Sequence, residues 1–140
     1  MTLLPENNQK LNEMFMNARA PEMSEFHGEY LVDMLTMMPS FRRFSHRKVF
    51  YSENGNVAGY NILFNKVWGH FFLEKGVCKK PDSLDVVVIN YNRSENTFVT
   101  KRIRDHVRCF ESGNSYIGRF HYLFMGKEYF LGYFSLSKLR

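Results

Sequence analysis

Arginine and histidine alternate with aromatic residues near the C-terminus, between positions 116 and 124. In a β-strand this spacing places Arg119 and His121 on one face, and Phe120 and Tyr122 on the other. A guanidinium beside an imidazole suits an anionic group, so we predict that Arg119 and His121 anchor a ligand in a cavity. The alternative is that the aromatic residues fill the interior and that Arg119 and His121 lie in solvent.

A cationic stripe precedes this stretch, because Arg102, Arg104, His106 and Arg108 occupy every second position. In an uninterrupted strand they share one face. Burying four such groups without partners is costly, so the default expectation is a solvated outer stripe. In the functional alternative, one or two of the arginines, Arg108 among them, contact a ligand carboxylate or phosphate at the mouth of a pocket.

The densest aromatic cluster lies at 68–72 and contains the one tryptophan of the chain. Regular alternation places Trp68 and His70 on the same face, where they would form a stacking wall with a hydrogen-bonding tip. Further predicted wall residues are Tyr60, Tyr91 and Phe134. The alternative is that these rings only fill a protein core.

Signatures of common enzymes and metal sites are missing from the sequence. It has no Cys-x-x-Cys, no His-Glu-x-x-His, no glycine-rich phosphate loop and no Gly-x-Ser-x-Gly. The five histidines are scattered, and no two have a spacing that brings them together on one face. We therefore predict no catalytic residue and no metal ligand, and no cofactor is indicated. A metal site assembled only by the fold stays open as an alternative.

Composition indicates a folded chain that forms a single domain over residues 1–140. Hydrophobic residues make up 44% and charged residues 24%, as in globular proteins, and the net charge of +5 favours anionic partners without identifying one. No apolar run approaches the roughly 18 residues that span a bilayer. Two cysteines in a chain of this size do not indicate a disulfide framework. We expect a cytoplasmic protein, monomeric or homodimeric, with both thiols free.

The elements that must position these residues are one helix followed by strands. Leu11, Met14, Phe15 and Ala18 recur with helical spacing, and Pro21 ends the pattern. This narrow apolar stripe needs a docking partner, so we predict that residues 1–20 form a helical lid or plug.

After Pro21 the spacing becomes that of strands, with turn residues every eight to twelve positions. Asn54-Gly55 is the clearest hairpin turn. The run at 84–91 is apolar throughout its centre, which predicts burial on both faces or cover by the helix. Predicted strands lie at 29–36, 48–52, 57–64, 66–73, 84–91, 97–103, 105–110, 116–124 and 128–136.

Eight to ten short strands joined by hairpins need a solution for their edges, and closure into a barrel removes the edges. We therefore predict an all-β protein with minor α content, an up-and-down antiparallel β-barrel over residues 26–137. A two-sheet sandwich is the competing arrangement, but it usually needs a long crossover.

The segment Phe26-His27-Gly28-Glu29-Tyr30, which opens the first predicted strand, resembles the motif found at the start of lipocalin-like (calycin) barrels. Tyr30 stands where that family usually has tryptophan. The run from Gly118 to Phe134 is similar in style to the closing strands of bacterial lipocalin-like proteins, including those with a GxWxG motif. The resemblance implies a barrel that encloses a cavity for a small, largely apolar ligand, and it carries over no catalytic residue.

The first functional hypothesis is an intracellular binding protein that holds a small hydrophobic or anionic molecule in the barrel cavity. The second is a small isomerase- or lyase-type enzyme that uses the same cavity, with His70 or His121 as general acid and base. Nucleic-acid binding through the stripe at 102–108, and a dimer face made of exposed aromatic residues, are further alternatives.

Overall fold

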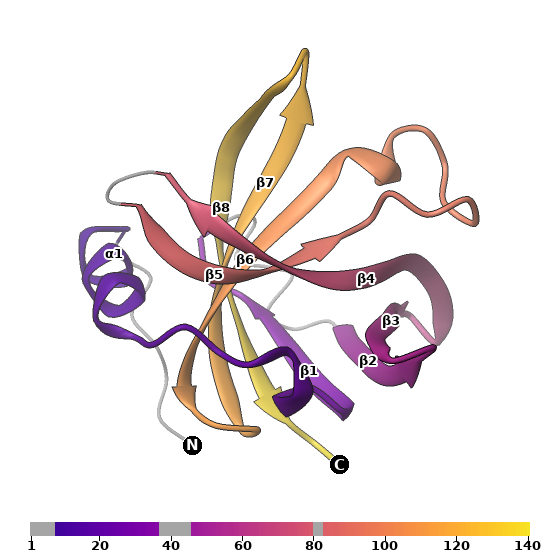
Figure 1. The fold of residues 1–140 in the computed structure, drawn as a ribbon, viewed down its shortest axis with the longest axis horizontal. Helices are drawn as coiled ribbons and strands as arrows, with labels where there is room; N and C mark the ends of the chain where they lie inside the picture. The colour runs from indigo at the N-terminus through magenta and orange to yellow at the C-terminus, as the bar shows by residue number, and fades with distance from the viewer. Residues whose placement is uncertain (1–7, 37–45, 80–82) are drawn as a thin grey trace.

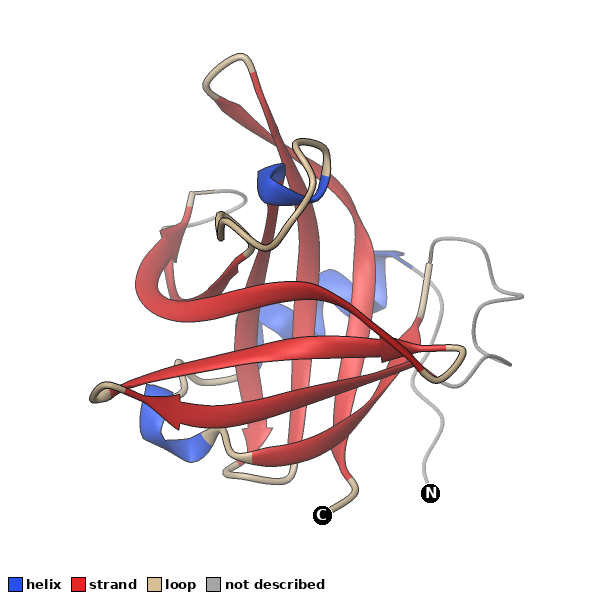
Figure 2. Cartoon of the chain, turned by 90° about the vertical axis from the view of Figure 1, so that its right-hand side faces the viewer, coloured by secondary structure: helices blue, strands red, loops and turns tan. Residues whose placement is uncertain are grey.

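The structure is a computed structural model that describes residues 8–36, 46–79 and 83–140. It is mostly β, as predicted, with eight antiparallel strands in chain order and β1 paired with β8 to close the barrel. Figures 1 and 2 show the strands wrapping round a common interior. The elements are α1 (Asn8–Asn17), η1 (Met23–Glu25), β1 (Gly28–Met34), β2 (His46–Glu53), β3 (Asn56–Leu63), β4 (Lys66–Cys78), β5 (Leu84–Asn90), η3 (Thr100–Arg102), β6 (Ile103–Glu111), β7 (Ser115–Phe124) and β8 (Lys127–Lys138).

The helix α1 packs on the outer wall of the barrel, beside β5 (Figure 1). Its buried residues Leu11 and Phe15 contact outward-facing side chains that include Val86, Val88 and Tyr133. The described part of residues 1–20 therefore docks on the barrel wall, and its helix does not fill an end of the barrel. None of the described helices is long and apolar enough to cross a membrane.

The segment after α1 supplies the plug. The Phe26 ring, which directly follows η1, stacks on Tyr116 at 4.5 Å between ring centroids and lies 5.2 Å from the Phe50 ring. Glu25 fixes the segment, because it accepts a hydrogen bond from the Tyr116 hydroxyl and pairs with Arg19. One end of the barrel is thus closed by residues 23–26.

Aromatic side chains occupy much of the barrel interior. Phe50 and Phe71 lie 5.3 Å apart, and Phe71 and Tyr91 lie 5.5 Å apart, all three being fully buried. These rings belong to one hydrophobic cluster that also includes Phe134 and residues from most of the other strands. On the aromatic face of β7, Phe120 packs partly against this interior cluster, whereas Phe124 is exposed.

A lysine also crosses the interior. Lys48 on β2 approaches Asp105 on β6, which is four strands away in a ring of eight and so stands opposite. The same ammonium lies 5.5 Å from the centre of the Phe71 ring and 5.8 Å from that of Phe134. Side chains from four strands therefore meet at this level, and they take up the space that a ligand inside the barrel would need.

Two predicted strands are corrected by the structure. The segment 97–103 is a turn followed by η3, and only Ile103 of this segment belongs to a strand. The β-propensity of residues 97–103 therefore does not decide the structure of the segment. β4 does not end at Leu73 but continues through Gly76 to Cys78, because it keeps pairing with β5 as far as Leu84. The longer β4 brings Cys78 to the outer face of the barrel.

Candidate functional site

A pocket of about 590 Å³ opens on the outer wall, between the end of β4 and the β7–β8 hairpin. Polar and apolar side chains share its lining, so it has the mixed character of a small-molecule site. The polar lining residues are Cys78, Lys79, His106, Arg119, His121, Lys127 and Glu128, and the apolar ones include Val77, Leu123, Tyr129 and Phe130.

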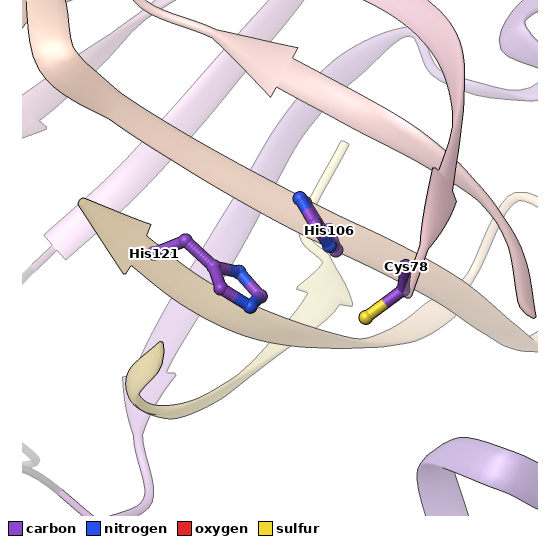
Figure 3. A group of neighbouring side chains, drawn as sticks. All are labelled: Cys78, His106 and His121. Carbon is purple, nitrogen blue, oxygen red and sulfur yellow. The ribbon is translucent and has the colours of Figure 1, made fainter. Parts of the chain in front are cut away.

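Three side chains with metal-ligating atoms converge in this pocket. Cys78, His106 and His121 come from β4, β6 and β7, and all three are buried. Their ligand atoms lie within 4.8 Å of one another, and Figure 3 shows the three side chains gathered on the wall. The two imidazole rings are stacked, with 4.0 Å between their centroids.

The strand register explains why the two histidines meet. β6 and β7 are antiparallel, and His106 on β6 pairs directly with Arg119 on β7. Arg119 stands two residues before His121 in the same strand. Residues two apart in a strand share a face, so His121 is a diagonal neighbour of His106. The pair is therefore built into the central part of the wall.

Each histidine has one nitrogen occupied by a neighbouring group. His106 Nε2 lies 2.7 Å from Glu128 Oε1, and its buried Nδ1 has no hydrogen-bond partner among the described residues. His121 Nδ1 lies 3.1 Å from the carbonyl oxygen of Arg119, to which it donates its proton. This leaves one nitrogen of each ring for another partner.

The same contacts change the pKa values of the cluster. Burial alone would raise the pKa of the Cys78 thiol, but His106 and Arg119 lower it below its ordinary value. Burial alone would lower the pKa of His106, but Cys78 and Glu128 raise it to about 9. Burial, together with the charges of His106 and Arg119, lowers the pKa of His121 to about 4. The contact between Cys78 and His106 thus lowers the pKa of the thiol and raises that of the imidazole, whereas the low pKa of His121 favours its neutral form.

Arg119 is held between sulfur and aromatic rings. Its Nη1 donates to Cys78 Sγ at 3.5 Å, and its guanidinium lies 4.3 Å from the centre of the Phe130 ring. Only 7% of Arg119 is exposed, and the residue nevertheless lines the pocket. A cation held in this way is in place before a ligand arrives.

A second polar group lies inside the barrel and is separate from the pocket. The Lys48 ammonium is 2.7 Å from Asn61 Oδ1, 2.5 Å from the Tyr91 hydroxyl and 3.8 Å from Asp105 Oδ2. Lys48 is 3% exposed and Asp105 1% exposed. Burial lowers the pKa of Lys48 to about 8 and raises that of Asp105 to about 6.

The structure brings only two of the eight predicted site residues into the pocket, namely Arg119 and His121. They lie on the outer wall but are buried, so neither the predicted cavity inside the barrel nor full exposure to solvent describes them. Tyr91 and Phe134 belong to the barrel interior, and Trp68 stacks on Tyr91 at 6.4 Å. The acid–base role considered for His121 stays a prediction.

A β-bulge separates Trp68 from His70. Gly69 has φ +60°, and the β3–β4 register shifts between Gly59 and Asn61, so the alternation across 68–72 is broken. Trp68 therefore pairs with the inward-facing Asn61, while His70 turns to the outside. Tyr60 lies beside His70 there, at 6.2 Å between rings. The prediction that Trp68 and His70 share a face is wrong for this reason.

The cationic stripe at 102–108 is not a continuous solvated surface, contrary to the default expectation. His106 and Arg108 are both buried. Arg108 is occupied by the backbone, since it donates to the carbonyl oxygens of Phe15, Ala18 and Asp85. It joins α1 to the barrel wall, and it does not line the pocket described above.

Cys78, His106 and Glu128 are site residues that the sequence pattern does not predict. Alternation along β6 could have placed His106 and Arg108 on one outer face, but it gives no sign that the end of β4 brings Cys78 close to that face. Cys78 and Glu128 arrive from hairpins 28 and 22 residues away from His106 in sequence, and no local pattern encodes those contacts. Both cysteines are free, as expected.

Comparison with known proteins supports the fold and goes no further. No protein-family model matches the chain, and no curated protein matches it in sequence. A crystal structure of a protein from Thermomonospora curvata has a similar fold, with a TM-score of 0.60. The similarity covers 96% of this chain and 88% of that one at 11% sequence identity. Likeness at this identity shows a shared barrel architecture and says nothing about a shared ligand.

Proposed function

We propose that this protein binds a small molecule with an anionic group and an apolar part, in the pocket on the outer wall of the barrel. A β-barrel of this kind is consistent with a ligand-binding protein. The observation that carries the proposal is Arg119, a buried guanidinium stacked on Phe130 at the wall of a pocket of about 590 Å³. The pocket volume is within the range typical of sites for small ligands.

The charges around the pocket favour an anion. Lys79, Arg119 and Lys127 line it, and Glu128 is its one carboxylate among the described residues. The Glu128 carboxylate is already engaged by His106. A ligand carboxylate, sulfonate or phosphate would therefore meet an excess of positive charge. Leu123, Val77 and Phe130 offer an apolar surface for the remainder of the molecule.

The hypothesis of a cavity inside the barrel is modified accordingly. Aromatic rings and the Lys48 side chain occupy the interior, whereas Arg119 and His121, which the sequence predicts as an anion anchor, line the outer pocket. Burial of ligand surface against Phe130 and Leu123 supplies the hydrophobic contribution in the outer pocket.

Membership of the lipocalin-like barrels is part of the proposal. It is supported by the closed eight-strand meander and by the start of β1, where Gly28 has φ +85° and packs against the backbone of Arg140. Tyr30 follows at the expected spacing, and the Lys138 ammonium lies 4.8 Å from the centre of its ring. A cytoplasmic location fits two reduced cysteines.

The experiment is a calorimetric titration of the chelator-treated protein with decanoate, with decanol as the uncharged comparison. We expect decanoate to bind and decanol to bind at least about 10-fold more weakly, because a charged hydrogen bond contributes about 1.5–3 kcal/mol. Arg119→Met should weaken decanoate binding by a similar factor. Arg102→Met is the matched control, since Arg102 lies 4.3 Å from the Phe98 ring in a similar cation–π contact, outside the pocket.

Fluorescence of Trp68 separates the outer pocket from the interior. Trp68 faces the interior beside Tyr91, so a ligand on the outer wall should leave its emission unchanged. Strong quenching of Trp68, with decanoate binding unaffected by Arg119→Met, would place the ligand inside the barrel and overturn the proposed site. Equal binding of decanol and decanoate would overturn the anionic part of the proposal.

A further inference from the structure

We propose that Cys78, His106 and His121 form a Zn²⁺ site on the outer wall, with three protein ligands and a fourth coordination position that opens into the pocket. The proposal goes beyond ligand binding, because it assigns a metal to the cluster in Figure 3. It rests on the donor atoms, their spacing, the groups that orient them and the position of the pocket.

The donor set is one that zinc prefers. One sulfur and two imidazole nitrogens form a borderline-soft combination, and Cys₂His and His₃ sets of the same size occur in zinc enzymes with an open position. Hard cations such as Mg²⁺ and Ca²⁺ select oxygen ligands instead. All three side chains are buried, so water competes weakly for them.

The spacing is close to that of a tetrahedral site. Zinc bonds to nitrogen and sulfur of about 2.0–2.3 Å place neighbouring ligand atoms about 3.5 Å apart. The ligand atoms of Cys78, His106 and His121 lie within 4.8 Å of one another before any ion is bound. Side-chain torsions can close a difference of about 1 Å without moving a strand.

Both imidazoles are oriented as metal ligands are. Glu128 contacts His106 Nε2, and the buried Nδ1 on the other side of the ring lacks a hydrogen-bond partner among the described residues. The Arg119 carbonyl accepts a proton from His121 Nδ1, so that His121 Nε2 carries the lone pair. Carboxylate or carbonyl contacts of this kind fix the tautomer and orientation of histidine ligands in metal sites.

The charges around the cluster suit a bound cation with an anion above it. The Arg119 guanidinium donates to Cys78 Sγ and favours the thiolate, which is the form that binds a metal. The Cys78 thiolate and the Glu128 carboxylate together offset the two charges of Zn²⁺. Because Cys78, His106 and His121 all line the pocket, the fourth position is open to a water molecule or to an anionic ligand held by Arg119.

The test begins with Co²⁺ and Zn²⁺ added separately to the chelator-treated full-length protein. We expect one equivalent of each metal by equilibrium dialysis and elemental analysis. The Co²⁺ form should show the visible bands of a tetrahedral ion and a thiolate-to-cobalt charge-transfer band, and Zn²⁺ should displace the cobalt. Octahedral Co²⁺ bands or substoichiometric binding would overturn the proposal.

Variants assign the ligands. Cys78→Ser should abolish the charge-transfer band, and His121→Gln should weaken Zn²⁺ binding by more than about 100-fold. Glu128→Gln should weaken it by about 10-fold to 100-fold, as expected for a residue that orients a ligand. Cys109→Ser and His70→Gln are the matched controls, because neither residue belongs to the cluster. Both controls should retain the wild-type affinity and spectrum.

Two outcomes would contradict the assignment. A charge-transfer band that survives in Cys78→Ser would mean that another thiol binds the metal, and a loss of the band in Cys109→Ser would identify that thiol. Circular dichroism of each variant checks that it has folded. Failure of the zinc site is distinguishable from failure of the proposed function, because decanoate binding is measured with chelator present and depends on Arg119.

Discussion

Lys48 on β2 and Asp105 on β6 face each other across the barrel, with the Lys48 ammonium 3.8 Å from Asp105 Oδ2. The Tyr91 hydroxyl lies between the two strands and contacts both groups, at 2.5 Å from the ammonium and 3.4 Å from the carboxylate. The interior thus contains an ion pair surrounded by aromatic rings. Desolvation of both charges opposes this arrangement, and their attraction offsets part of that cost.

This pair should give the protein a pH dependence of stability with a minimum near neutral pH. Asp105 has a folded-state pKa of about 6, above the unfolded value near 3.8, so its contribution is present below pH 4 and is lost as pH rises through 6. Lys48 has a folded-state pKa of about 8, below the unfolded value near 10.5. Its contribution to stability is therefore fully present above pH 10.5 and is lost as pH falls through 8. Urea unfolding of wild type and of Lys48→Met/Asp105→Asn over this range isolates the effect, because other groups cancel in the difference. A constant difference across the range would contradict it.

The single variant Lys48→Met should be more destabilised at pH 7 than at pH 5. Removal of Lys48 leaves the Asp105 carboxylate without its cation, which costs about 3–5 kcal/mol for a buried pair. At lower pH Asp105 takes up a proton and the cost declines. Urea unfolding at the two pH values measures the difference, and Lys75→Met, at an exposed position on β4, provides the comparison.

Phe26→Ala should destabilise the protein by about 3–5 kcal/mol, since it removes the ring that closes one end of the barrel. The exposed Phe98, of which 72% is accessible, gives the matched control. Phe98→Ala should change the free energy of unfolding by less than about 0.5 kcal/mol. Equal effects of the two substitutions in urea unfolding would show that Phe26 is not part of the core.

Gly118→Ala should be destabilising because a ring occupies the space beside Gly118. A Cβ atom there would lie 2.1 Å from the Phe134 ring, and overpacking of a core costs about 1–3 kcal/mol. Combining Gly118→Ala with Phe134→Leu should recover part of this loss. A double-mutant cycle by thermal unfolding measures the coupling, and strictly additive effects would argue against the contact.

Zinc should raise the melting temperature of the wild type. A ligand that binds only the folded state stabilises it by about 2.7 kcal/mol at 100 times its dissociation constant. Cys78→Ser should show no such shift, whereas Cys109→Ser should behave as wild type. Differential scanning calorimetry with and without Zn²⁺ makes the comparison. A similar shift in Cys78→Ser would indicate binding elsewhere.

Much of the fold follows from local sequence patterns. Asn54 and Gly55 have the positive φ angles that the hairpin turn requires, and the apolar run from Val86 to Ile89 is buried on both faces because α1 covers its outer side. The segment 97–103 was predicted as a strand from its residue types, but no neighbouring strand is available to pair with most of it. β-propensity acts through such neighbours, so it fails where they are absent.

The site was less predictable because long-range contacts assemble it. Alternation correctly placed Arg119 and His121 on one face of β7, but it did not indicate which structure covers that face. The bulge at Gly69 turns His70 to the face opposite the one predicted. A glycine within a predicted strand does not indicate from the sequence whether the strand is regular or bulged at that position. Cys78 reaches the histidines only because β4 extends past Gly76 to Cys78, still paired with β5.

The position of β5 between two hydrophobic clusters has a consequence for local opening. Its inward residues pack in the barrel and its outward residues pack against α1, so detaching the helix would uncover Val86 and Val88 while Val87 and Ile89 stayed enclosed. The backbone amides that join β5 to β4 and β6 should therefore exchange with deuterium only when the whole barrel unfolds, long after those of α1 have exchanged.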